Sequence, residues 1–109
     1  MIENRISDRA KILLIDEDTS ISYLIRRAME KENYKIYIAG SGKQGMEMST
    51  GVCPDLILMD IKMPNLDGLE ATKIIRELSP TVPIIGTDFF RITQKNFGRC
   101  AYILRGRKS

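Results

Sequence analysis

Residues 11–18 have the sequence KILLIDED, a short apolar run that ends in three consecutive acidic residues. Apolar residues at successive positions predict a strand that is buried on both faces, as the strands of parallel sheets are. The pattern recurs at 55–60, where DLILM is followed by Asp60. The sequence therefore predicts two buried strands, each of which ends at a carboxylate.

The rest of the chain alternates between helical and strand patterns. We expect helices over 21–29, 41–50 and 66–78, and further strands over 35–39, 82–86 and 100–104. Strands that alternate with helices favour right-handed crossovers and a parallel sheet that is covered on both faces. The prediction is an α/β fold, a flavodoxin-like doubly wound sheet of five parallel strands in the order 2-1-3-4-5.

Apolar spacing also predicts which side chains the helices bury. The first helix is expected to begin at a cap, Asp18, Thr19 or Ser20, with Asp18 alternatively in a solvated turn. Its inward face is predicted to contain Ile21, Leu24, Ile25, Ala28 and Met29. The inward face of the helix over 66–78 is predicted to contain Leu69, Ile74, Ile75 and Leu78. The helix over 41–50 is expected to be weaker, since Gly42 and Gly45 each cost up to ~1 kcal/mol relative to alanine.

Composition excludes several kinds of site. The 109 residues contain no histidine, which excludes from this chain a Ser-His-Asp or Cys-His pair, a His-bearing zinc site and a phosphohistidine. Cys53 and Cys100 are not in CxxC spacing, and we expect both to be buried free thiols. No apolar run approaches the ~18–20 residues of a membrane span, and the first residues have no signal-peptide core. One domain in the cytoplasm, with no membrane partner, is therefore expected.

The net charge of +3 is unevenly distributed along the chain. Residues 1–88 contain 11 Lys and Arg and all 14 Asp and Glu, a balance of −3, whereas residues 89–109 contain six basic residues and no acid. A basic average would normally favour nucleic acid as a partner. The tail RGRKS lacks the interleaved aromatic residues of nucleic-acid-binding segments, so we expect it to be solvated and a nucleic-acid partner is disfavoured.

Acidic residues follow both of the apolar strands predicted to be neighbours. Asp16 and Glu17 end the first strand and Asp60 ends the third, so the three carboxyl groups should converge on one crevice at the carboxyl edge of the sheet. Like charges this close raise at least one pKa unless something offsets them, and Mg²⁺ suits a few carboxylates together with waters and phosphate oxygens. A carboxylate there could accept a phosphoryl group, with Thr87 and Arg105 at later strand ends as phosphate contacts. Taken alone, Asp16-Glu17-Asp18 could instead be a solvated turn or helix cap.

These residues resemble the response-regulator receiver domains of two-component signalling. The resemblance is close over 11–86, through ILLIDED and the highly specific stretch PDLILMDIKMPNLDGLEATKIIR. It implies that Asp60 is the phosphoacceptor and that Asp16 and Glu17 are the acidic pair around Mg²⁺. The backbone carbonyl of Lys62 would be a further metal ligand, and Thr87 the hydroxyl switch residue.

The resemblance also implies the partners. The phosphoryl donor would be a histidine kinase or a histidine phosphotransfer protein, which suits a chain without histidine. The domain would catalyse only its own phosphorylation and would not be an enzyme in the usual sense. Residues 1–10 would be a polar lead, 11–105 the receiver domain and 106–109 a basic tail.

The match is weaker over 87–105. Tyr102 is at the position of the family's aromatic switch, but it could equally be an ordinary core residue. Arg105 replaces the family's usual lysine, but it could equally be one more member of the basic tail. Asp88 adds bulk and charge beside Thr87, and too few residues follow Arg105 to form the family's last helix. One hypothesis is self-association through the uncovered sheet face. The alternative function is a non-switching or truncated receiver-like interaction module.

Overall fold

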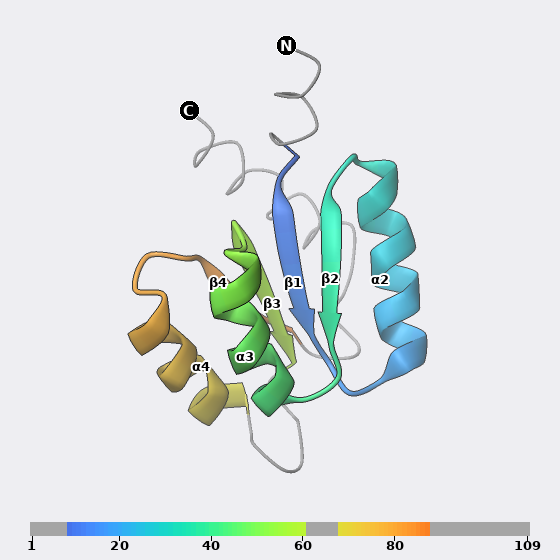
Figure 1. Cartoon of the computed structure of the whole chain (residues 1–109). Coiled ribbons are helices and arrows are strands. Elements are labelled where there is room, and N and C mark those ends of the chain that lie inside the picture. Colours follow the sequence, from blue (N-terminus) through green and yellow to red (C-terminus); the bar gives the residue numbers. More distant parts are fainter. Residues whose placement is uncertain (1–8, 61–67, 88–109) are drawn as a thin grey trace.

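A parallel sheet with helices packed on it forms the part of the chain that the computed structural model describes, residues 9–60 and 68–87 (Figure 1). The elements in chain order are β1 (Lys11–Ile15), α2 (Thr19–Lys31), β2 (Lys35–Ala39), α3 (Gly42–Val52), β3 (Leu56–Asp60), α4 (Gly68–Leu78) and β4 (Ile84–Thr87). None of the helices within these residues is long and apolar enough to cross a membrane.

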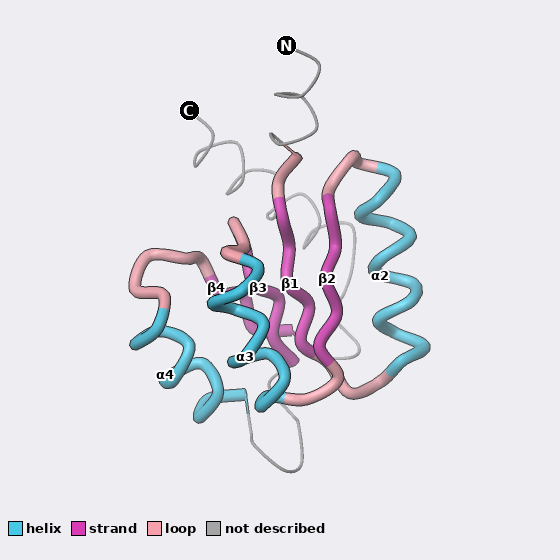
Figure 2. Tube along the Cα trace, viewed as in Figure 1, coloured by secondary structure: helices cyan, strands magenta, loops and turns pink. Residues whose placement is uncertain are grey.

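The described strands lie in the order β2-β1-β3-β4 and all three pairings are parallel (Figure 2). This confirms the predicted α/β class and the predicted order of the first four strands. The expected strand over 100–104 and Cys100 lie outside the described residues, and the expectation about a last helix also concerns that part of the chain.

Alternate residues of each strand pack into two separate apolar layers. On β1, Ile12 and Leu14 join one layer with Ile25 and Met29 of α2. Leu13 and Ile15 point the other way and join a second layer that includes residues of α4. The sheet is therefore buried on both faces, which is why successive positions of β1 are apolar.

The predicted strands over 11–15 and 35–39 are confirmed, whereas the other two shift. β3 begins one residue later than expected and includes Asp60, and β4 begins at Ile84. Pro83 has no N–H to donate, but its carbonyl accepts a hydrogen bond from the Ile57 N–H at 2.9 Å. Arg76 of α4 holds the loop before β4 by donating to the carbonyls of Pro80 (3.1 Å) and Val82 (2.5 Å).

Of the three residues predicted as possible caps, Asp18 is the N-cap of α2. Its carboxylate accepts hydrogen bonds from the backbone N–H groups of Ser20 (3.0 Å) and Ile21 (3.1 Å). Thr19 and Ser20 are instead the first residues of the helix. A carboxylate cap satisfies N–H groups that have no partner within the helix and also interacts favourably with the helix dipole.

The predicted inward face of α2 was wrong at Leu24, which is 63% exposed. The buried residues are Ser22, Ile25 and Met29, which are spaced by three and four residues along one side of the helix. Leu24 lies ~100° around the helix axis from Ile25, so it faces outward although its spacing from neighbouring apolar residues is helical. Apolar spacing alone could not reveal that the small polar Ser22 occupies the buried face.

Two further burial predictions were also wrong. Leu78 is 51% exposed, because α4 ends at this residue. The residues of α4 that are buried against the sheet are Ala71 and Ile75. Cys53 is exposed, because it ends α3 as the C-cap, where the chain turns in the left-handed conformation with φ 53°.

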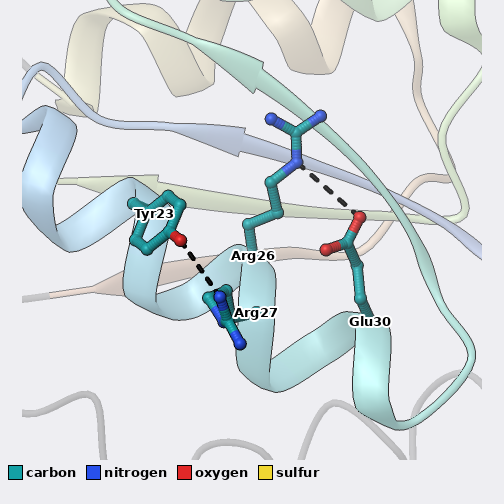
Figure 3. A network of polar contacts seen from close by, with 4 residues as sticks. All are labelled: Tyr23, Arg26, Arg27 and Glu30. Carbon is teal, nitrogen blue, oxygen red and sulfur yellow. Dashed lines mark hydrogen bonds and ion pairs between the residues drawn. The ribbon is translucent and has the colours of Figure 1, made fainter.

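The outer side of α2 carries polar side chains that contact one another (Figure 3). Arg27 donates a hydrogen bond to the Tyr23 hydroxyl at 3.1 Å, and Arg26 lies 3.8 Å from the Glu30 carboxylate. Exposed pairs of this kind contribute a few tenths of a kcal/mol at most, roughly 0.2–0.5 each. The position of α2 on the sheet is therefore determined by its buried face.

Truncation of two neighbouring residues of α2, one at a time, should distinguish its buried face from its exposed face. Ile25→Ala is expected to lower the free energy of unfolding by about 2–4 kcal/mol, because it removes buried apolar atoms and leaves a cavity. Leu24→Ala should change it by no more than ~0.5 kcal/mol. Urea unfolding of both variants measures the difference, and an equal loss for the two would contradict the orientation of α2.

Candidate functional site

Parallel pairing places two aspartates next to each other at the carboxyl edge of the sheet. Ile15 of β1 is paired with Met59 of β3. The next residue on each strand is an aspartate, Asp16 and Asp60, and the two side chains are close enough for Asp60 to raise the pKa of Asp16. Ligand sites of doubly wound sheets lie beyond the carboxyl ends of the strands, so this pair marks the candidate site.

Asp16 is held in place at its backbone and at its side chain. Its N–H donates to the carbonyl of Ala39 at the end of β2, at 3.0 Å. Its Oδ1 accepts a hydrogen bond from the Asp18 N–H at 2.9 Å. With 5% of its surface exposed, the Asp16 carboxyl has little access to water and little freedom to move.

These surroundings raise the pKa of Asp16 to about 6. Burial is the largest cause, because it removes water that would stabilise the charged form. The hydrogen bond from the Asp18 N–H partly opposes this, whereas the nearby Asp60 and Asp18 carboxylates raise the pKa further. A pair of carboxyl groups in this state would be stabilised by a cation with affinity for oxygen.

Glu17, the third carboxylate predicted here, follows Asp16 but has an exposed side chain. Within residues 9–60 and 68–87, no three Asp, Glu or Cys side chains come together as a metal-binding group. The structure therefore brings Asp16 and Asp60 together, without Glu17. A metal-binding role for Glu17 stays a prediction.

Thr87, the predicted hydroxyl contact, is at the end of β4. It is paired with Asp60 across β3 and β4, so its backbone lies beside the predicted phosphoacceptor. Lys62, Tyr102 and Arg105 lie outside the described residues, and their predicted roles stay predictions.

The sequence did not predict that Asp18 orients the Asp16 side chain. The Asp18 N–H binds the carboxylate two residues earlier, an Asx-type turn for which aspartate is well suited. The sequence Asp16-Glu17-Asp18 directly after a strand is the pattern that could have predicted this turn. Asp18 thus contributes its N–H to Asp16 and its carboxylate to the cap of α2.

The raised pKa of Asp16 predicts how stability depends on pH without metal. The folded state binds a proton at about pH 6, and the unfolded state only near ~3.9. Stability should therefore increase as the pH falls from 7 through 6 toward 4, by up to about 3 kcal/mol from this group. Asp16→Asn keeps the Oδ1 acceptor and should be more stable than the wild type at pH 7.

Urea unfolding at several pH values in the presence of a chelator measures this dependence. Asp55→Asn is the matched control, because Asp55 is at the opposite end of β3, where its carboxylate accepts a hydrogen bond from the Lys11 N–H at 2.8 Å. A wild type that loses stability steadily from pH 7 to pH 5 would contradict the electrostatics described for Asp16.

Comparisons with known proteins show which family the chain belongs to. The family model of the response regulator receiver domain matches residues 12–90. Sporulation initiation phosphotransferase F of Bacillus subtilis is 33% identical over 75 residues, which are 69% of this chain and 60% of that protein. Response regulator ArlR of Staphylococcus saprophyticus is 32% identical over 100 residues, 87% of this chain and 45% of that protein.

Among solved structures, a response regulator receiver domain protein from Clostridium thermocellum is similar to this chain. Its TM-score is 0.70 at 25% identity, over 85% of this chain and 75% of that one. The chain spans less than two thirds of the length of the two curated relatives. The family model covers well over half of this chain, and the chain belongs to the response regulator receiver domain family.

Proposed function

We propose that this receiver domain accepts a phosphoryl group on Asp60 in two-component signalling. The observation that supports the proposal is the contact between the carboxyl groups of Asp16 and Asp60 at the ends of paired strands. The 109 residues contain no histidine, so a phosphohistidine donor must lie outside them. The proposed donor is a histidine kinase or a histidine phosphotransfer protein, and the proposed location is the cytoplasm.

The exposure of the two aspartates favours Asp60 as the acceptor. Asp16 is buried, and its Oδ1 is engaged by the Asp18 N–H. Asp60 is only partly buried, so a donor can reach it more easily. An attacking oxygen must approach the phosphorus in line with the bond that breaks, and Asp60 is the more exposed of the two aspartates to such a donor.

The proposed transfer balances without an oxidant or reductant. A carboxylate oxygen of Asp60 forms a bond to phosphorus as the phosphorus–nitrogen bond of the donor breaks. The electron pair of that bond stays on the imidazole nitrogen, which takes a proton from solvent. The product is an aspartyl phosphate on Asp60, so the phosphoryl group stays on the domain that catalysed the transfer.

The donor set fits Mg²⁺. Asp16 and Asp60 provide hard carboxylate oxygens, which Mg²⁺ prefers as ligands, and burial together with the nearby carboxylates makes the charged form of Asp16 costly without a cation. The backbone carbonyl of Lys62 is the proposed third ligand, and Glu17 could take part through water, since Mg²⁺ usually keeps several waters. When bound, Mg²⁺ would neutralise charge on the phosphoryl oxygens.

Thr87 is proposed to bind the phosphoryl group through its hydroxyl, from the strand next to Asp60. Arg105 is proposed as a cation for the same group and Tyr102 as the aromatic switch. A change in the contacts of Thr87 after phosphorylation would shift the population between two conformations.

Labelling with a small phosphodonor tests the proposal. In the presence of Mg²⁺ and acetyl phosphate, the wild type should gain the mass of one phosphoryl group, as measured by intact mass spectrometry. Asp60→Asn should gain none, because an amide is not a nucleophile for this transfer. Removal of Mg²⁺ with a chelator should reduce the labelling rate at least tenfold.

Asp55→Asn is the control variant, since Asp55 directly precedes the same strand at its other end. It should be labelled at the wild-type rate. Equal labelling of the wild type and Asp60→Asn, or no labelling of the wild type by any donor, would refute the assignment of Asp60.

A further inference from the structure

Helix α3 is in close contact with β1 at the residue that precedes Asp16. Gly45 of α3 is buried and packs on the fully buried side chain of Ile15, the last residue of β1. A Cβ atom on residue 45 would lie 2.7 Å from Ile15 Cγ1 and 3.1 Å from Cγ2, and closer still to Cδ1. Ile15 therefore occupies the space that any side chain at residue 45 would need.

Ile15 is connected to the site through the backbone. Asp16 is the next residue, and in the sheet Ile15 is paired with Ala39 on one side and Met59 on the other. Met59 directly precedes Asp60. Well-packed interiors transmit displacements instead of absorbing them, so a shift of Ile15 would change the position of Asp16 relative to Asp60.

We propose that Gly45 is a positioning residue: its missing side chain lets Ile15 pack against α3, and this packing sets Asp16 beside Asp60. The effect of this packing on Mg²⁺ binding rests on the proposed function, whereas its effect on the position of Asp16 does not. In the helix, glycine costs up to ~1 kcal/mol relative to alanine. Close approach to Ile15 gives a physical reason for a glycine at this position.

The chain contains a matched control in the same helix. Gly51 is also in α3, but a Cβ atom there would have no atom within 4 Å. Gly51→Ala therefore tests the gain in helix propensity alone. Gly45→Ala adds the same methyl group where Ile15 is in the way.

A compensating variant tests the pair directly. Ile15→Val removes the Cδ1 methyl, which is the atom closest to the added Cβ, and the shorter side chain can turn Cγ1 and Cγ2, the other two atoms near it, toward the space that Cδ1 leaves. The double variant Gly45→Ala/Ile15→Val has as many side-chain carbon atoms at this contact as the wild type, and volume-conserving changes are the ones that cores tolerate best. It should fold even if Gly45→Ala alone does not.

The first measurement uses the metal-free protein. In ¹H–¹⁵N NMR spectra, Gly45→Ala should shift the amide resonances of Asp16 and Asp60, and the double variant should return them toward the wild-type positions. Gly51→Ala should leave both resonances in place. Unshifted Asp16 and Asp60 resonances in a folded Gly45→Ala, or failure of the double variant to reverse the shifts or to fold, would overturn the proposal.

The second measurement is a titration with MgCl₂. Gly45→Ala should weaken Mg²⁺ binding about three- to tenfold, and the double variant should recover most of the affinity, whereas Gly51→Ala should bind as the wild type does. A merely structural role would lower stability without changing the affinity of the folded protein, and that result would contradict the positioning role. If the wild type binds no Mg²⁺ but the amide shifts appear and reverse, the proposed function fails and the positioning role of Gly45 is supported.

Discussion

Two carboxyl groups in contact at the edge of a parallel sheet are the constraint on which the rest of this structure depends. Asp16 and Asp60 follow residues that are paired across β1 and β3, so the register of the sheet brings them together. Burial of Asp16 and the nearby carboxylates make its ionisation unfavourable, and its pKa rises to about 6. Ionisation of Asp16 beside Asp60 therefore lowers the stability of the fold at neutral pH.

The sheet that carries this pair is stabilised by apolar layers on both faces. Ile12 and Leu14 of β1 pack into one layer, and Leu13 and Ile15 into the other. Because both layers contact the same strand, β1 has little freedom to slide or tilt. The site residues at its end are therefore placed by the core, and Gly45 belongs to this arrangement because it lets α3 approach Ile15 closely.

Much of the fold could be predicted from the sequence because its pattern is local. Apolar runs ended by aspartate predicted β1 and β3, and strand–helix alternation predicted a parallel sheet, for which the flavodoxin-like order is confirmed in the four described strands. The burial of Leu24 was wrongly predicted because the face of α2 depends on the sheet beneath it, where Ser22 is buried. The burial of Cys53 was also wrongly predicted, because apolar patterns do not reveal the left-handed turn that it makes at the end of α3.

The candidate site was predictable in part for the same reason. The positions of Asp16 and Asp60 follow from strand ends and strand order, whereas the exposure of Glu17 depends on how the chain turns into α2. The double use of Asp18, as a cap and as an N–H donor to Asp16, requires a turn geometry that spacing does not specify. Close packing of Gly45 on Ile15 joins residues far apart in the sequence and is visible only in the folded chain.

The effect of Mg²⁺ on the free energy of unfolding tests the central proposal, that the Asp16–Asp60 pair binds Mg²⁺. At pH 7, Mg²⁺ well above its dissociation constant should stabilise the wild type by about 1–3 kcal/mol, and an equal ionic strength of NaCl should not. The variants Asp16→Asn and Asp60→Asn should lose this stabilisation. A wild type whose stability is unchanged by Mg²⁺, or an Asp16→Asn variant that is stabilised as much as the wild type, would contradict the account.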